Sequence, residues 1–258
     1  MNIPIRKEVI PHIIFGWMIV LIIMLVLWVT GVDPAILAGV VLAILLLMTG
    51  YFLWFFRDPD RQSPDDETLV LAAADGRVTS VVRFSAEEFR KICLDSGLSE
   101  SQIGRMKALS NGTVIRVSIF LSLLDVHVNR TPISGMSEFL GYFPGKRLFT
   151  TNEKSSSENQ HNAIWISNNQ IDCLLFQIVG PVARRVVYWF DNHHPVYISM
   201  GERIGMMKFG SRLDLYLPDP VVTIVISPGD KVTAGITPVA ILNRPGTVIH
   251  EPHLSSPP

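Results

Sequence analysis

IIFGWMIVLIIMLVLWVT (residues 13–30) and PAILAGVVLAILLLMTGYFLWFF (residues 34–56) decide how this chain is organised. Neither stretch contains a charged residue, and at 18 and 23 residues both are long enough to cross a lipid bilayer as a helix. Only Gly31, Val32 and Asp33 separate them. Two such helices joined by a tight turn predict a transmembrane helical hairpin, which makes residues 1–56 an N-terminal membrane anchor.

The charges that flank the hairpin predict its orientation. Arg6 and Lys7 precede it, Arg57 and Arg61 follow it, and the connection between the helices has no lysine or arginine. By the positive-inside rule, both ends and the rest of the chain should lie on the cytoplasmic side of the cell (inner) membrane. A cleaved signal peptide would have a shorter apolar core and no second span behind it. A buried hairpin of a globular fold would need a far larger body than the roughly 200 residues that remain.

The composition of the whole chain excludes several classes of function. Hydrophobic residues make up 48% of the 258 residues, and the excess lies in the two apolar stretches. A net charge of -1 gives no electrostatic reason to expect a nucleic acid partner. Cys93 and Cys173 have neither CxxC nor metal-ligand spacing, so we expect no disulfide framework, redox dithiol or metal site.

Beyond the anchor, the pattern is that of a domain made mostly of strands. Residues 57–68 (RDPDRQSPDDET) are charged and contain proline, which favours an exposed linker. Ser85 and Glu88 form a capping box that predicts a helix ending near Gly97. The expected fold of residues 69–258 is therefore mainly β with a few helices (α+β). Segments rich in β-branched and aromatic residues predict strands at 69–84, 113–124, 163–179, 185–190, 212–217 and 221–226.

Two segments share a rhythm of turn, valine, second turn and apolar strand. They are AADGRVTSV (residues 73–81) and SPGDKVTAGITPVAIL (residues 227–242). The second is similar to the hairpin of lipoyl-like and biotinyl-like domains, although it lacks a lysine placed for modification. This rhythm predicts a barrel-sandwich-like domain.

Three residues of different types could together carry chemistry: Asp75, His127 and Ser211. Each alone has an ordinary structural explanation, because Asp-Gly pairs form hairpin turns, a lone histidine beside an apolar run is often structural, and Gly-Ser at a strand start is commonly a turn. Together they are the residue types of an activated serine nucleophile. The residues alone therefore indicate a serine nucleophile with a histidine base, beside the structural alternative.

A resemblance to a known family adds to this pattern. GERIGMMKFGSR (residues 201–212) and the segment KFGSRLDLYLP around Ser211 resemble the approach to the self-cleavage site of phosphatidylserine decarboxylase proenzymes of the short (type A) form. FLSLLDVHVNRTP (residues 120–132) resembles the family's Asp-x-His region. AAADGRV and RDPDRQSP resemble its Asp-Gly turn and its entry from the anchor. The likeness covers residues 51 to 242 in order.

The resemblance implies a self-processing enzyme. The chain would cut itself between Gly210 and Ser211 into residues 1–210 (the beta chain) and 211–258 (the alpha chain), and Ser211 would become a pyruvoyl group. His127, oriented by Asp75, would take the proton of the serine hydroxyl. The pyruvoyl ketone would form a Schiff base with phosphatidylserine and accept the electrons released with carbon dioxide, yielding phosphatidylethanolamine. No pyridoxal phosphate is expected, because no phosphate cup for it is recognisable.

The chain departs from the longer relatives at one position. They carry a second histidine three residues after the first, and here that position is Arg130. If the second histidine is the base for self-cleavage in those relatives, the role must pass to His127 or be met differently. For the lipid phosphate, Arg184, Arg185 and Lys208 are the candidates, since a guanidinium can bind phosphate in a bidentate manner.

The resemblance also implies the partners. They are phosphatidylserine in the membrane and the two cleaved chains associated with one another; a homo-oligomer is left open. Two alternatives remain at this point: a non-enzymatic, membrane-tethered barrel-sandwich adaptor, and a decarboxylase of a related lipid such as archaetidylserine. An adaptor would remain one intact polypeptide, whereas the enzyme would be found as two fragments.

Overall fold

The computed structural model describes residues 5–146, 148, 150, 158–180, 186–208 and 210–243. The chain divides into two compact units, Met1–Asp60 and Arg61–Pro258. Each unit is considered by itself below.

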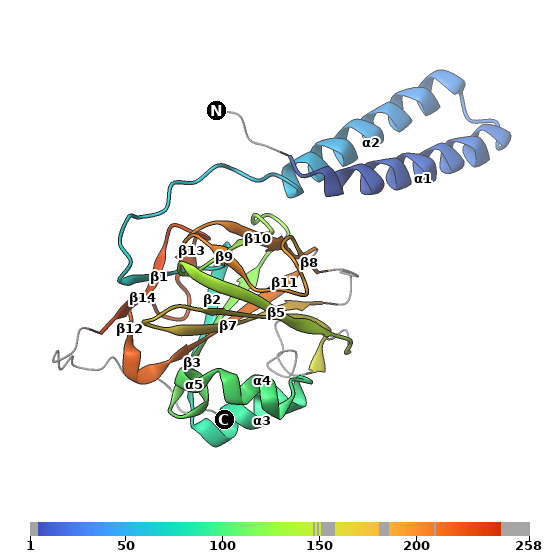
Figure 1. The fold of residues 1–258 in the computed structure, drawn as a ribbon. Coiled ribbons are helices and arrows are strands. Elements are labelled where there is room, and N and C mark those ends of the chain that lie inside the picture. Colours follow the sequence, from blue (N-terminus) through green and yellow to red (C-terminus); the bar gives the residue numbers. More distant parts are fainter. Residues whose placement is uncertain are drawn as a thin grey trace. The chain divides into compact units, whose positions relative to one another are not determined.

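The first unit is a helical hairpin (Figure 1). A short 3-10 turn, η1 (Lys7–Val9), leads into α1 (Ile10–Val29), and α2 (Pro34–Phe55) returns antiparallel to it. The side chain of Asp33 caps α2 by accepting the backbone N–H groups of Ala35 and Ile36 at 2.8 and 3.2 Å. Most of the large apolar side chains of both helices are exposed. Both helices are long and apolar enough to cross a membrane. The predicted hairpin is confirmed, although its first helix begins at Ile10 rather than at residue 13.

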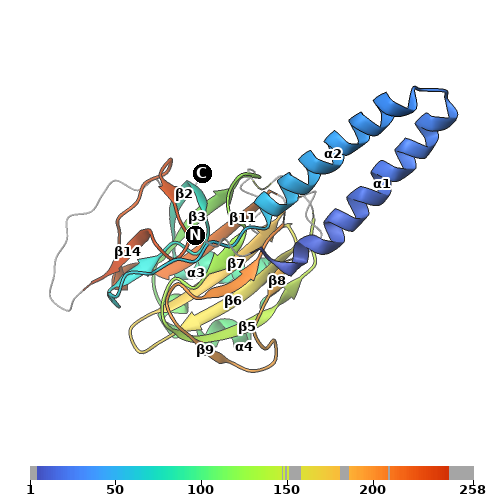
Figure 2. The same cartoon turned by 90° about the horizontal axis from the view of Figure 1, so that it is seen from above.

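The second unit is built around an eight-stranded antiparallel sheet, in the order β13-β2-β3-β11-β7-β6-β5-β9. Figure 2 shows β7, β6 and β5 side by side in this sheet. Its strands are β2 (Gly76–Phe84), β3 (Val114–Leu121), β5 (Gly135–Phe143), β6 (His161–Ser167), β7 (Asp172–Val179), β9 (Val196–Ile198), β11 (Ser211–Pro218) and β13 (Lys231–Val232).

Two smaller sheets accompany the large one. The first has the order β1-β14-β12 and the second the order β4-β10-β8. A 3-10 turn, η2 (Asp219–Val221), leads into β12. The strands are β1 (Leu69–Leu71), β14 (Pro238–Leu242), β12 (Val222–Ile224), β4 (Val128–Arg130), β10 (Arg203–Met206) and β8 (Val187–Tyr188).

The large sheet separates two hydrophobic cores, because successive side chains of a strand point to opposite faces. Leu213, Leu215 and Leu217 of β11 belong to a core shared with the small sheets. Tyr216 of the same strand belongs to a core shared with three helices. Figure 1 shows these helices together on one face of the sheet. They are α3 (Ala86–Asp95), α4 (Glu100–Arg105) and α5 (Lys107–Ser110).

The fold class predicted from the sequence, mainly β with a few helices, is confirmed. The capping box is present at α3, and the chain turns at Gly97, whose φ is +93°. The continuous strands predicted at 69–84 and 163–179 are wrong, since the first breaks into β1 and β2 and the second is the hairpin of β6 and β7. An apolar run alone does not distinguish one long strand from two that are joined by a turn.

Candidate active site

Ser211 is the first residue of β11, which lies in the middle of the large sheet. It pairs with Leu121 of β3 on one side and Val179 of β7 on the other. Alternation along β11 turns its side chain to the same face as Leu213, toward the core under the small sheets. The side chain is completely buried, and its Oγ atom has no hydrogen-bond partner among the residues that the structure describes. A buried hydroxyl without a partner is costly, which points to a chemical role.

The peptide bond before Ser211 has an unusual backbone environment. Gly210 has φ +68°, in the left-handed region that favours glycine. Its carbonyl oxygen accepts a hydrogen bond from the backbone N–H of Gly180 at 3.2 Å. A Cβ atom on Gly180 would lie 2.9 Å from that oxygen, so only glycine lets the two backbones approach this closely. The carbonyl carbon next to Ser211 therefore already has a donor directed at its oxygen.

His127 is buried immediately before β4, and its backbone continues the ladder with β10 by accepting from the N–H of Met207 at 3.1 Å. Its ring Nδ1 lies 3.0 Å from the carbonyl oxygen of Asp125. Because a carbonyl can only accept, Nδ1 donates here, and Nε2 is the nitrogen that carries the lone pair whenever the ring is neutral. The Asp125 carboxylate accepts from the N–H and Oγ–H of Ser122 at 2.8 and 2.6 Å, which holds this turn in place.

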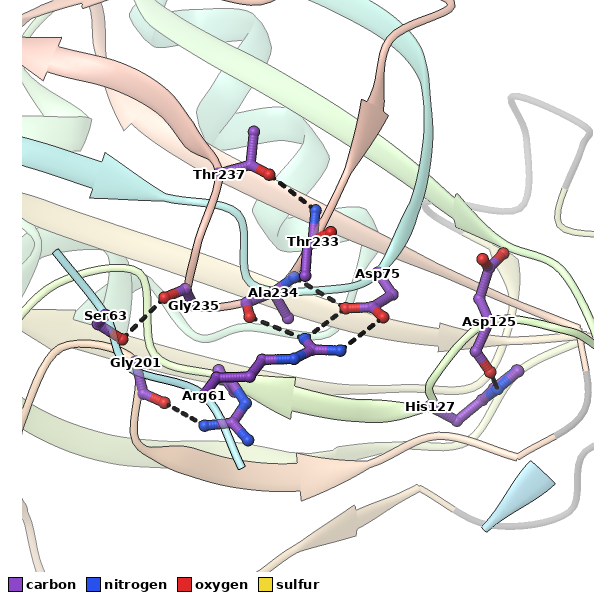
Figure 3. Close-up of polar contacts among 11 residues, drawn as sticks. Arg61, Ser63, Asp75, Asp125, His127, Gly201, Thr233, Ala234, Gly235 and Thr237 are labelled. Carbon is purple, nitrogen blue, oxygen red and sulfur yellow. Dashed lines mark hydrogen bonds and ion pairs between the residues drawn. The ribbon is translucent and has the colours of Figure 1, made fainter. Parts of the chain in front are cut away.

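Asp75 lies in the turn just before β2 and forms an ion pair with Arg61. Two nitrogens of the Arg61 guanidinium donate to the two carboxylate oxygens at 2.6 and 2.8 Å, and the N–H of Ala234 donates to the carboxylate at 2.8 Å. The same guanidinium donates to the carbonyl of Ala234 at 2.8 Å. Only 9% of the Arg61 side chain and 14% of the Asp75 side chain are exposed. Figure 3 shows this cluster, with His127 and Asp125 placed apart from it.

The Asp75 cluster joins the two segments that share a rhythm in the sequence. Asp75 lies in the first of them, and Ala234 lies in a turn of the second, where the Thr237 hydroxyl accepts from the N–H of Thr233 at 2.9 Å. Ser63 donates to the carbonyl of Gly235 at 2.7 Å. Sequence reasoning missed Arg61, because a charged residue within a charged, proline-containing segment gives no sign of burial.

The structure thus places the predicted residues in three local arrangements. Ser211 and Gly210 lie against Gly180, His127 against Asp125, and Asp75 against Arg61. The orientation of His127 by Asp75 and the catalytic roles of both residues stay predictions.

Four positions remain: Arg130, which stands where the longer relatives have their second histidine, and the three candidates for the lipid phosphate. Arg130 is buried in β4 and donates from Nη1 to the carbonyl of Gly201 at 2.9 Å. Lys208 is partly buried two residues before Gly210, whereas Arg184 and Arg185 lie outside the described residues. Within the described part of the chain, no group of three or more His, Cys, Asp or Glu residues could hold a metal ion.

Comparison with known proteins agrees with the resemblance seen around Ser211. The family model for phosphatidylserine decarboxylase matches residues 48–240. A protein from Desulfotalea psychrophila named phosphatidylserine decarboxylase proenzyme is 31% identical over 237 residues, covering 92% of this chain and 95% of that protein. The part of the chain that the family model matches includes the Asp75 turn, His127 and the Gly210-Ser211 bond. This chain belongs to the phosphatidylserine decarboxylase family and is a decarboxylase of that family.

Proposed function

We propose that this decarboxylase matures by cutting itself between Gly210 and Ser211 and by converting Ser211 into a pyruvoyl group. One observation carries the proposal: a buried serine hydroxyl, which has no partner among the described residues, directly follows a carbonyl that already accepts an N–H donor. The name proenzyme, which the relative from Desulfotalea psychrophila bears, supports it.

The first step would be an acyl shift at the Gly210-Ser211 bond. Nε2 of His127 takes the proton of the Ser211 hydroxyl as Oγ attacks the carbonyl carbon of Gly210. The C–N bond between the two residues then breaks as His127 returns the proton to the leaving nitrogen, which leaves an ester and a free amine. Negative charge develops on the Gly210 oxygen during the attack, and the N–H of Gly180 is placed to stabilise it.

Elimination would complete the cut. Loss of the Ser211 Cα proton breaks the bond between Oγ and Cβ, releasing Gly210 as a carboxylate and leaving dehydroalanine at position 211. The dehydroalanine then tautomerises to an imine, and water hydrolyses the imine, which releases the nitrogen as ammonia and leaves a ketone. A pyruvoyl group so formed supplies an electron-accepting carbonyl to which the amine of a substrate can attach.

The buried surroundings of position 211 fit such a group. Ser211 lies at the start of a strand whose residues are all buried, so the ketone would be held away from bulk water. The strand is paired on both sides with strands of the 1–210 fragment, β3 and β7. These backbone ladders and the shared core would keep the two fragments associated after the cut.

The substrate we propose is phosphatidylserine held in the membrane, with phosphatidylethanolamine and carbon dioxide as products. The family and the two apolar helices support this assignment. The charges that flank the hairpin favour a catalytic domain on the cytoplasmic side. Anchoring the domain beside a lipid that cannot leave the bilayer raises the rate at which the two meet. Lys208, Arg184 and Arg185 remain the candidates for the lipid phosphate.

A denaturing gel combined with intact mass measurement tests the proposal. The wild-type chain should yield two fragments, the smaller one covering residues 211–258 with a pyruvoyl group at its first position. Ser211→Ala should remain one polypeptide and release no carbon dioxide from phosphatidylserine, whereas Ser101→Ala, at an exposed position of α4, should behave as the wild type. An active protein recovered as one unbroken chain would reject the mechanism. Assays with ester-linked and ether-linked serine lipids would then define the substrate.

A further inference from the structure

Three buried amide side chains form a directed chain of hydrogen bonds. Nδ2 of Asn162 on β6 donates to Oε1 of Gln177 on β7 at 3.2 Å, and Nε2 of Gln177 donates to Oδ1 of Asn129 on β4 at 2.7 Å. None of the three is more than 2% exposed. The second bond crosses from the large sheet to a small one. The chain ends at Nδ2 of Asn129, which has no acceptor in the described part of the protein.

Strand register places this end of the chain at the Ser211 face. Gln177 pairs with Leu213, and Val179 pairs with Ser211, so the side chains of Gln177 and Ser211 lie on one face two positions apart. Alternation along β4 puts Asn129 on the same side as His127. Asn129 thus contacts Gln177 on the face of the large sheet that also carries Ser211.

Backbone geometry makes this crossing bond possible. Gly205 of β10 pairs with Asn129, and a Cβ atom on it would lie 3.2 Å from Nε2 of Gln177. A side chain at this position would crowd the bond. The cation next in sequence, Arg130, is turned to the opposite side of β4. The donor that faces the Ser211 side is therefore a neutral amide.

The other end of the chain reaches a cavity. Asn162 lines a hollow of about 320 Å³ together with Phe139, Tyr142 and Tyr188. Phe139 and Tyr188 stack there with ring centroids 5.2 Å apart. A polar chain that runs from this cavity into the core fits a site for a polar group better than it fits a structural core.

We propose that the Asn162–Gln177–Asn129 chain forms a subsite for the carboxylate of the serine headgroup, with Nδ2 of Asn129 as the donor that contacts it. This inference rests on the proposed function. A buried N–H without an acceptor favours a ligand that supplies one, and a carboxylate oxygen is the strongest acceptor in the substrate. A neutral donor orients the carboxylate without the ground-state stabilisation that an arginine would add, and such stabilisation would oppose the loss of carbon dioxide.

The experiment compares the substrate with its product, because phosphatidylethanolamine differs from phosphatidylserine only by the carboxylate. Mature full-length protein in detergent micelles is incubated with either lipid, and borohydride fixes the bound amine onto position 211. The yield against lipid concentration, read by mass of the small fragment, gives an apparent Kd. Asn129→Asp should raise the apparent Kd for phosphatidylserine at least tenfold, or ~1.4 kcal/mol. The apparent Kd for phosphatidylethanolamine should stay within twofold of the wild-type value. Asn111→Asp, at an exposed position, should change neither value.

Other outcomes separate this proposal from the function on which it rests. If Asn129→Asp weakens the binding of both lipids equally, or changes the binding of neither, the proposal is overturned. Should Asn129→Asp fail to mature, Asn129→Ser and Gln177→Glu provide the same comparison, the second by withdrawing the N–H that holds Asn129. Loss of maturation in all three variants would assign the amide chain a structural role and also reject the subsite. A wild-type chain that yields no small fragment would instead reject the proposed function.

Discussion

Gly180→Ala should slow self-cleavage while the fold is preserved. The new Cβ atom would lie 2.9 Å from the carbonyl oxygen of Gly210, closer than real Cβ atoms come to other atoms. That oxygen belongs to the backbone next to β11, which is paired on both sides. We therefore expect the N–H of residue 180 to be pushed beyond its present 3.2 Å from the oxygen.

The size of the effect follows from the role of the donor. Removing one donor from an oxyanion site typically costs about 2.7–4 kcal/mol, or about 10²- to 10³-fold in rate. Alanine retains the N–H but displaces it, so the loss should be about half of that. A loss of about 1.4–2 kcal/mol corresponds to a rate about tenfold to thirtyfold lower.

A pulse-chase of newly synthesised chain, resolved on a denaturing gel, measures this rate directly. Gly104→Ala is the matched control, because a Cβ atom there meets nothing within 4 Å among the described residues and the position is helical. It should cleave as the wild type does. If Gly180→Ala keeps a native circular dichroism spectrum and cleaves within twofold of the wild type, the donor has no part in the cut.

Three further predictions concern stability and reactivity, the first two measured by urea unfolding of uncleavable Ser211→Ala chains. Arg61→Met should lower the unfolding free energy by about 2–4 kcal/mol, because it leaves the carboxylate of Asp75 mostly buried with a single backbone donor; an unchanged midpoint would contradict this. Burial lowers the pKa of His161 in the folded chain, whereas in the unfolded chain this histidine binds a proton near pH 6.5. Stability should therefore fall as the pH drops from about 7 to 5, and His161→Gln should flatten that slope. Burial raises the pKa of the Cys93 and Cys173 thiols, so iodoacetamide at pH 8 should label them only after unfolding, as read by mass spectrometry; rapid labelling of the folded chain would count against their burial.

Local sequence determined the anchor, the first helix of the catalytic domain and the position of the candidate serine. Two long uncharged stretches need no tertiary context to be recognised as helices that suit a bilayer. The capping box at Ser85 and Glu88 acts within one helical turn, so the sequence predicts it without knowledge of the fold, and the structure contains it. The segment around Ser211 is contiguous, and its likeness to the decarboxylase family needs no knowledge of the fold.

Tertiary structure alone decided which distant groups the candidate residues contact. Gly180 reaches Gly210, Arg61 reaches Asp75 and Gln177 reaches Asn129 through strand register, crossovers between sheets and close backbone approach. None of these pairs is local in the sequence, and a one-residue shift of register would turn each strand's side chains to the other face. The sequence alone identifies the candidate serine. The contacts made by Gly180, Arg61 and Gln177 form only when the chain has folded and its strands are paired.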